Sequence, residues 1–380
     1  MKKKTAVLLA LALGISTLGS SAAFADEYPL DTSDWTEDEL EMFGDLTVYE
    51  DQPTVVIIPK ALQYAFWQSV NKGAQTVADA FNVKLVFDAP ADESAVADQV
   101  DMANSYMNQD PAVMAVCPID DGSFEDFFNS AISREMPIIG FNNTINAPDG
   151  AIKATAATDN YLAAKEAATQ IFTSEKFMAN LEAATPENPV LIGCMPQDVT
   201  SPSMTQRAQG FIDGIKEGCA ELFPDGVAVT GQENFAEECE GDMVVEIRVQ
   251  LPATSSTSDA QLQAQTFLNE QNLIGLFYTD TGRCDGLLAA TSDGMDLGEG
   301  GRYENVTVVG FDAGANQKAA IKSGYIYGAV AQDPVRIGQD TMLLAIAVNQ
   351  GKEVNDIGTK YVFYQADDID DPAMSDILYD

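Results

Sequence analysis

The sequence predicts an α/β protein built from two doubly wound domains, and three observations point to this class. The chain has 380 residues, which is more than one hydrophobic core usually organises. From residue 54 onward, short and nearly continuous apolar runs alternate with amphipathic segments, the pattern of parallel strands covered by helices on both faces. The alternation restarts near residue 159, so a second domain of the same kind follows the first.

The first predicted domain begins with a strand at 54–59. The helix after it places Phe66, Val70, Val77 and Phe81 at helical spacing. The other predicted elements of this domain are strands at 83–88, 112–117 and 137–142 and helices at 93–109 and 123–134.

The second predicted domain continues the alternation and ends in a long helix. Its elements are helices at 159–173, 203–222, 258–271 and 284–291 and strands at 190–195, 226–230, 243–250, 273–279 and 306–311. The last long helix starts at Asp333-Pro334, with the aspartate as N-cap and the proline at the first helical position. We expect this helix to bury one face, made of Ile337, Thr341, Leu344 and Val348.

The N-terminus predicts a secretory signal peptide at residues 1–25. Three lysines precede an apolar run that ends in Ala23-Phe24-Ala25, a small-x-small cleavage pattern. The run is too short for a membrane anchor, and no later segment is long and apolar enough to span a bilayer. We therefore expect an exported protein, in the periplasm or on the extracellular face of the cell envelope.

The chain is strongly acidic. Removal of the signal peptide takes the net charge from −39 to −42, because it removes three lysines and no acid. Nucleic acid and anionic membranes repel such a chain, so nucleic acid is excluded as a partner. Residues 26–51 precede the first strand and are predicted to form an acidic surface arm.

Histidine is absent, which removes the commonest general base and the commonest zinc ligand. No cysteines are spaced as CxxC, and we expect no metal site and no cofactor. Cys117 and Cys194 lie in apolar strands and are expected to be buried. Cys219 and Cys239 flank one loop-rich segment of an exported chain, and for them a disulfide and two free thiols both remain open.

Polar side chains stand at the carboxyl ends of the predicted strands, where open α/β sheets bind ligands. Asp312 ends the run VTVVGF and Gln332 ends YIYGAVA. Carboxylates and amides pair with adjacent hydroxyl groups, and aromatic rings stack on C–H faces. The polar side chains at these strand ends are therefore suited to bind a neutral polyol. The tips contain no nucleophile–base pair and no phosphate loop, and we expect no enzyme.

In the strands that end at Asp312 and Gln332, the chain resembles periplasmic substrate-binding proteins of the ribose/galactose type, the exported components of sugar ABC importers. The resemblance covers about residues 53–365. The family's C-terminal signature consists of V-G-F-D, A-I-K-x-G, A-Q-x-P and G. It is similar to this chain's VVGFDAGANQKAAIKSGYIYGAVAQDPVRIG. Four further stretches fit the family in order and spacing: FWQSVNKGAQ, MPIIGFNN, TDN at 158–160 and QRAQGF at 206–211.

The resemblance implies a type I periplasmic binding protein fold, in which two lobes joined by a three-segment hinge close on a ligand. It assigns 52–157 plus 334–357 to the N-terminal lobe and 158–333 plus 358–380 to the C-terminal lobe. It also implies ligand-binding roles, in which Phe66 and Trp67 stack on a sugar ring and polar groups read its oxygen atoms. The implied polar residues are Asn142, Asn143, Arg207, Asp280, Asp312 and Gln332.

Departures from the family pattern leave the sugar open. Asn142-Asn143 is neutral where sugar binders usually have Asp-Arg, and Cys117 stands where ribose binders often have asparagine. A hexose, a deoxy- or amino-sugar, a glycoside and a sugar alcohol fit equally well. Because Asp280 and Asp312 face one counter-charge, Arg207, we expect neutral or weakly cationic ligands over acidic sugars.

The resemblance predicts a monomeric solute-binding protein that delivers a monosaccharide-like ligand to ABC permease subunits, with a chemoreceptor as a further candidate partner. One alternative is a sensor that presents sugar to a membrane receptor, and another is a binder of a nucleoside or other small polar solute. Transcriptional regulators share this fold, but here a signal and an acidic arm occupy the place of their DNA-binding helices. A glycoside-cleaving enzyme with Asp280 and Asp312 as its carboxylate pair is the remaining alternative.

Overall fold

The computed structural model describes residues 29–33, 35–375 and 377–379, so the predicted signal peptide lies outside the described residues. The chain divides into two units, one that ends at Asp45 and one that spans Leu46–Asp380. Across the described part of the chain, no helix combines the length and apolar character needed to cross a membrane.

The first unit contains one helix, α1 (Glu37–Phe43), among its described residues. Its N-terminus is closed by a capping box, in which the Glu39 amide donates to Thr36 Oγ1 (3.2 Å) and the Thr36 amide donates to Glu39 Oε2 (2.6 Å). The acidic residues of the first turn complement the helix dipole. Part of the predicted acidic arm is therefore helical.

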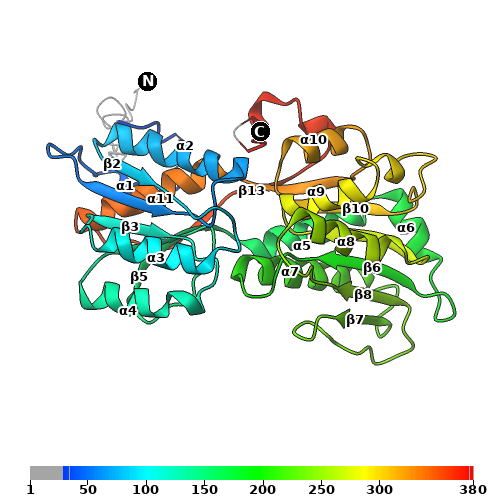
Figure 1. Ribbon diagram of the computed structural model, residues 1–380. Helices are drawn as coiled ribbons and strands as arrows, with labels where there is room; N and C mark the ends of the chain where they lie inside the picture. The colour runs from blue at the N-terminus through cyan, green and yellow to red at the C-terminus, as the bar shows by residue number, and fades with distance from the viewer. Residues whose placement is uncertain (1–28, 34, 376, 380) are drawn as a thin grey trace, which may run out of the picture. The chain divides into compact units, whose positions relative to one another are not determined.

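The second unit begins with a six-stranded parallel sheet in the order β12-β5-β4-β3-β1-β2. Figure 1 shows α2 and α11 on one face of this sheet and α3 and α4 on the other. We call this sheet with its helices the first lobe. Its elements are β1 (Thr54–Ile58), α2 (Ala65–Ala80), β2 (Lys84–Phe87), α3 (Val96–Met107), β3 (Val113–Val116), η1 (Gly122–Phe124), α4 (Glu125–Ser133), β4 (Ile138–Phe141), β5 (Ile152–Thr158), α11 (Pro334–Asn349) and β12 (Ile357–Thr359).

The second sheet has seven strands in the order β13-β11-β10-β9-β6-β8-β7, and only the edge strand β13 runs antiparallel to its neighbour. We call this sheet with its helices the second lobe. Its elements are α5 (Asn160–Ile171), α6 (Glu175–Glu182), β6 (Val190–Met195), α7 (Pro202–Cys219), β7 (Val227–Gly231), β8 (Val245–Val249), α8 (Thr257–Leu268), β9 (Leu273–Tyr278), α9 (Thr281–Ala290), η2 (Met295–Leu297), β10 (Thr307–Phe311), α10 (Ala315–Lys322), β11 (Gly328–Gln332), β13 (Tyr361–Tyr364), η3 (Ala366–Asp368) and η4 (Pro372–Met374).

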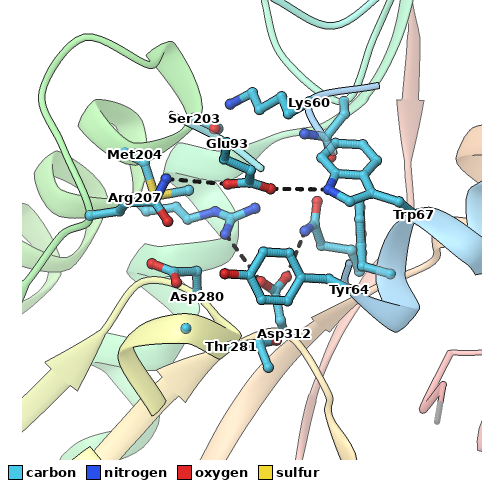
Figure 2. A pocket seen from close by; sticks show the side chains of 15 residues that line it. Lys60, Tyr64, Trp67, Glu93, Ser203, Met204, Arg207, Asp280, Thr281 and Asp312 are labelled. Atoms are coloured by element: carbon cyan, nitrogen blue, oxygen red, sulfur yellow. Dashed lines mark hydrogen bonds and ion pairs between the residues drawn. The ribbon is translucent and has the colours of Figure 1, made fainter. Parts of the chain in front are cut away.

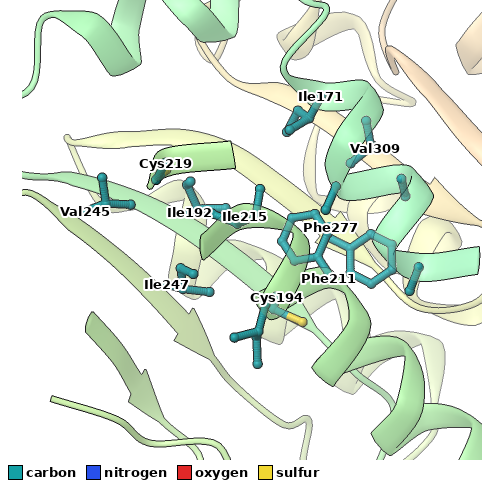
Figure 3. Packing of buried hydrophobic residues seen from close by; sticks show 14 of the residues in the cluster. Ile171, Ile192, Cys194, Phe211, Ile215, Cys219, Val245, Ile247, Phe277 and Val309 are labelled. Carbon is teal, nitrogen blue, oxygen red and sulfur yellow. The ribbon is translucent and has the colours of Figure 1, made fainter. Parts of the chain in front are cut away.

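Each lobe has its own hydrophobic core. In the second lobe, Phe211 of α7 stacks on Phe277 of β9 with ring centroids 4.3 Å apart and planes 7° from parallel. Figure 3 shows these rings among apolar side chains of the helices and strands, with Cys194 and Cys219 in the same cluster. Such interdigitation holds the strand ends in fixed positions.

The chain passes between the two sheets at three places. It leaves the first sheet after Thr158 of β5, returns between Gln332 of β11 and Pro334 of α11, and leaves again between β12 and β13. The last place lies just beyond the division at 357/358 that the sequence predicts, which cuts through β12. The lobe boundaries themselves remain our prediction.

The doubly wound α/β fold is confirmed. The start of α11 also follows the prediction, because Asp333 Oδ1 accepts from the Arg336 amide at 2.9 Å and Pro334 takes the first turn. The prediction of a single buried face on this helix was wrong: residues 340–347 are buried without interruption. The helix packs against α2 on one side and against β3, β4 and β5 on the other.

Candidate functional site

The carboxyl ends of strands from both sheets meet around one cavity (Figure 2). The empty space that these residues surround, part of it open to solvent, is about 460 Å³. The residues that line it are Lys60, Tyr64, Phe66, Trp67, Glu93, Asn142, Gln197, Ser203, Met204, Arg207, Asp280, Thr281, Gly282, Asp312 and Gln332.

The cavity brings together seven of the eight residues that the sequence predicts as ligand-binding: Phe66, Trp67, Asn142, Arg207, Asp280, Asp312 and Gln332. Asn143 does not line it. Asn143 is fully buried, and its Oδ1 accepts from Asn142 Nδ2 at 3.3 Å. Its place in the structure is that of a support for the Asn142 side chain.

Asp312 occupies the end of β10 in a strained backbone conformation. Its φ of 72° lies in the left-handed region, which costs energy for a residue other than glycine and clusters at functional sites. Asp312 Oδ1 accepts from Gln332 Nε2 at 2.7 Å, and Oδ2 lies 3.5 Å from Arg207 Nη1. Burial raises the pKa of the Asp312 carboxyl group, although Arg207 and Gln332 act in the opposite direction.

Asn142 repeats this arrangement in the first lobe. Both residues follow a Gly-Phe pair at a strand end, in GFN and GFD, and Asn142 has a φ of 63°. The Asn142 amide donates to Ala156 O at 2.8 Å and the Asp312 amide donates to Val330 O at 2.7 Å. In each sheet the tip residue stays paired with the next strand while its side chain reaches the cavity.

Arg207 of α7 is held by the protein on several sides. Its Nε donates to Asn160 Oδ1 at 2.8 Å and its Nη1 donates to Thr279 O at 2.6 Å. The guanidinium carbon lies 3.7 Å from the centre of the Phe311 ring, so a cation–π contact also stabilises the guanidinium group. Only 2% of Arg207 is exposed, so its charge is buried and does not belong to a surface ion pair.

Asp280 has a structural role as well as a place in the cavity wall. It is the N-cap of α9, where Oδ1 accepts from the Arg283 amide at 3.1 Å. Its Oδ2 accepts from Thr279 Oγ1 at 2.9 Å and lies 4.0 Å from Arg283 Nη1. Both carboxylate oxygens of Asp280 therefore have protein partners.

Glu93 is a cavity residue that the sequence prediction missed. It lies in the loop after β2, and its Oε1 accepts from Trp67 Nε1 at 3.0 Å, as Figure 2 shows. Its Oε2 accepts from Gln197 Nε2 at 3.2 Å. Trp67 belongs to the first lobe and Gln197 to the second, so Glu93 links the two. The strand-end rule, applied to the strand at 83–88, would have indicated this loop.

Lys60 and Tyr64, also outside the predicted set, complete the first-lobe wall. Lys60 is buried, and its Nζ donates to Ser201 Oγ of the second lobe at 2.6 Å. Burial, together with nearby Glu93 and Asp280, raises the pKa of the Tyr64 hydroxyl group. Tyr64 therefore stays protonated and can donate a hydrogen bond into the cavity.

Two acceptors in the cavity wall have no hydrogen-bond donor from the protein. They are Asn142 Oδ1 and Gln332 Oε1, and both atoms are buried. A buried acceptor without a donor costs free energy. Donor groups of a ligand would satisfy both.

The cysteines are five free thiols in the structure. Cys117 and Cys194 are buried, as predicted. Cys219 is also buried, which raises its pKa to about 12, and Cys239 Sγ donates to Gly241 O at 3.2 Å, so these two are not bonded to each other. Within the part of the chain that the structure describes, no three His, Cys, Asp or Glu side chains are grouped as metal ligands would be.

Several solved structures share the fold. An "ABC transporter, LacI family transcriptional regulator" from Brachyspira murdochii has a TM-score of 0.73 and 27% identity, over 87% of this chain and 99% of that chain. An ABC transporter solute-binding protein from Agrobacterium vitis with bound D-fucose has a TM-score of 0.69 and 21% identity, over 86% and 100%. GanP, a glucose-galactose binding protein from Geobacillus stearothermophilus, has a TM-score of 0.67 and 16% identity, over 84% and 100%.

A search of curated proteins found no match. Residues 55–353 match the family described as "Periplasmic binding protein domain". This segment contains most of both sheets and every residue that lines the cavity. The chain belongs to the periplasmic binding protein domain family.

Proposed function

We propose that this chain is an exported solute-binding protein that captures a monosaccharide or closely related polyol and delivers it to an ABC importer. The observation that carries the proposal is the pair of buried acceptors, Asn142 Oδ1 and Gln332 Oε1, on residues from different lobes that line one cavity. A polyol offers several hydroxyl donors within a few ångströms of one another, and each hydroxyl group can also accept a hydrogen bond.

The site residues have complementary roles in this proposal. Asp312 and Asn142 accept from ligand hydroxyl groups, Arg207 donates to ring or hydroxyl oxygens, and Phe66 and Trp67 cover a C–H face of the sugar. Arg207 and Asp312 are already fixed by the protein. Pre-positioned groups lose little conformational freedom when a ligand binds, which raises affinity.

The charges that line the cavity favour a neutral or weakly cationic ligand. The carboxylates are Glu93, Asp280 and Asp312, and the cations are Lys60 and Arg207. Lys60, which the sequence prediction left out, reduces the acidic excess but does not remove it. An acidic sugar would therefore meet net repulsion, whereas an amino sugar would not.

Solved relatives carry sugars of the proposed class. Three of them contain bound D-fucose, D-arabinose and α-D-tagatopyranose. We extend this class of ligand to the present chain. We also propose that the protein is a monomer that binds its ligand without catalysing a reaction, in the periplasm or on the extracellular face, with ABC permease subunits as partners. A chemoreceptor is a further proposed partner, and a sensor-only role and a nucleoside or other polar ligand remain alternatives.

A thermal-shift screen of residues 26–380 tests the proposal. The panel contains D-fucose, D-arabinose, D-tagatose, hexoses, amino sugars, uronic acids, polyols and nucleosides. A ligand at a hundred times its dissociation constant adds about 2.7 kcal/mol of stability. A shift with a neutral or amino sugar supports the proposal, a shift with nucleosides alone supports the non-sugar alternative, and a shift with uronic acids alone contradicts the charge argument.

A further inference from the structure

The segment after β13, described at residues 365–375 and 377–379, returns from the second lobe to Phe66, which lines the cavity. It continues beyond the part that matches the family, which ends at residue 353. In Figure 1 this red segment passes over α10 before the chain ends. Two lysines of α10 hold it: Lys322 Nζ lies 2.5 Å from Asp370 Oδ2, and Lys318 Nζ donates to Leu378 O at 2.9 Å.

Tyr379 near the end of this segment contacts both lobes. Its ring meets the ring of Phe66 edge to face, with centroids 5.8 Å apart and planes at 71°. Its hydroxyl oxygen accepts from the Ala313 amide at 3.1 Å. Phe66 belongs to α2 of the first lobe, and Ala313 follows Asp312 in the second. Tyr379 is buried, with 6% of its surface exposed.

The two contacts respond differently to a separation of the lobes. The segment is fixed to the second lobe through β13 and α10, so the bond to Ala313 persists when the lobes part. The contact with Phe66 joins different lobes and is lost. It therefore stabilises only the arrangement in which the lobes are closed, and it needs no ligand atom to do so.

The position of Tyr379 also connects it to the proposed site. Phe66 and Thr281 line the cavity, and the Tyr379 hydroxyl group interacts with Thr281 and with the charge of Asp312. Burial is the main cause that raises the pKa of this hydroxyl group, so Tyr379 stays neutral in this place. A neutral ring can remain against Phe66 without the cost of a buried charge.

We propose that residues 365–375 and 377–379 act as a latch, in which Tyr379 stabilises the closed arrangement of the two lobes through Phe66 and slows the release of the bound ligand. Its effect on ligand release rests on the proposed function, whereas its effect on closure does not. An edge-to-face aromatic contact shifts a two-state balance by roughly two- to twelve-fold. A shift in the closed population changes ligand affinity by a related factor.

Single-molecule energy transfer measures closure without any ligand. The dyes are attached at Gln75→Cys on α2 and Gln265→Cys on α8, both exposed positions. Cys239→Ser removes the one native thiol that is not buried. The variants are Tyr379→Ala, Tyr379→Phe and the control Asp367→Ala, which changes an exposed residue of the same segment.

We expect Tyr379→Ala to lower the ratio of closed to open molecules by roughly two- to twelve-fold and Asp367→Ala to leave this ratio unchanged. Tyr379→Phe keeps the ring and loses the interactions of the hydroxyl group with Ala313 and Thr281, so its effect is smaller. It serves as the second variant should Tyr379→Ala fail to fold. Equal closed fractions in wild type and both Tyr379 variants overturn the latch. A wild-type chain without a closed population also overturns it.

Dissociation of the sugar identified by thermal shift is the second readout. The dissociation rate should rise in Tyr379→Ala by about the same factor as the ratio of closed to open molecules falls, with little change in the association rate. A merely structural role would lower the melting temperature and leave both the closed fraction and the dissociation rate unchanged. If no sugar binds the wild type, the proposed function fails, and energy transfer alone decides the latch.

Discussion

Arg207 and Asp312 form a buried ion pair in the wall of the cavity, with Nη1 and Oδ2 3.5 Å apart. Each partner is held by other protein groups, Arg207 by Asn160 and Thr279 and Asp312 by Gln332. A buried pair of this kind is a weak source of stability, because the loss of hydration offsets much of the attraction. Its value lies in two oppositely charged groups that are ready for a ligand.

Asp312→Asn tests the ligand role of this pair. The amide retains the shape of the carboxyl group but loses its charge, and hydrogen bonds to charged groups contribute about 1.5–3 kcal/mol. We expect the affinity for the identified sugar to fall by roughly ten- to a hundred-fold, measured by calorimetric titration. Asp126→Asn changes an exposed carboxyl group of α4 and is the control. Unchanged affinity in Asp312→Asn would remove Asp312 from the site.

The raised pKa of Asp312 predicts how ligand binding depends on pH. An ionised carboxylate accepts hydrogen bonds at both oxygens, and protonation removes part of this capacity. Burial raises the pKa of Asp312 above the ordinary 3.8. As the pH falls, affinity should therefore start to decrease at a higher pH than an exposed aspartate would allow. Titrations over about pH 4 to 7 measure this, and a profile flat down to 3.8 would contradict it.

The same shift affects stability in the opposite direction. At a pH between the ordinary pKa of 3.8 and the raised pKa of the folded state, the folded chain binds the Asp312 proton more tightly than the unfolded chain does. The stability that this proton contributes is fully present below 3.8 and is lost as the pH rises through the folded-state pKa. The difference in unfolding free energy between wild type and Asp312→Asn isolates this contribution from that of the other acids.

The sequence predicted the sheets and most of the cavity because both follow from short-range patterns. Buried parallel strands are continuous apolar runs, and a polar residue that ends such a run lies at the ligand-binding edge by geometry alone. Asp312 and Gln332 were found in this way, and the family resemblance added Arg207 from α7. The alternation of apolar strand-like runs with amphipathic helical segments was enough to predict the α/β class.

The remaining features depend on contacts between distant segments. Asn142 and Asn143 are neighbours in the sequence, but successive residues at a strand end point in opposite directions, and only Asn142 reaches the cavity. Glu93 lies in a loop whose path no periodicity fixes. The full burial of α11 depends on α2, which is more than 200 residues away in the sequence. Tyr379 lies beyond the family signature, in an acidic segment that resembles a solvated tail.

Trp67 should report ligand binding by fluorescence. The chain has two tryptophans, and Trp67 lines the cavity whereas Trp35 precedes α1. We expect a change of emission on sugar binding that Trp67→Phe abolishes and Trp35→Phe retains. Loss of the Nε1–Glu93 bond (3.0 Å) should also weaken binding about ten-fold in Trp67→Phe. A signal that disappears in Trp35→Phe instead would place the ligand elsewhere.

The close contact of α2 and α11 predicts a large effect of a single methyl group on stability. A Cβ atom at Gly73 would lie 1.9 Å from Val335 O, and one at Gly338 would lie 1.9 Å from Val70 O. Both obstructing atoms belong to the backbone, so the helices would have to move apart. Overpacking of this kind costs about 1–3 kcal/mol, more than the roughly 1 kcal/mol that alanine gains over glycine in a helix.

We therefore expect Gly73→Ala and Gly338→Ala each to lower the free energy of unfolding, measured by urea denaturation of the ligand-free chain. Gly358→Ala is the matched control, because a Cβ atom there meets no atom within 4 Å. Since α11 carries the chain back to the first lobe directly after Gln332, a wider spacing of α2 and α11 should also displace Phe66 and weaken sugar binding. If the two helix variants are as stable as Gly358→Ala, the helices can separate freely, and the spacing of α2 and α11 does not hold Phe66 in the cavity wall.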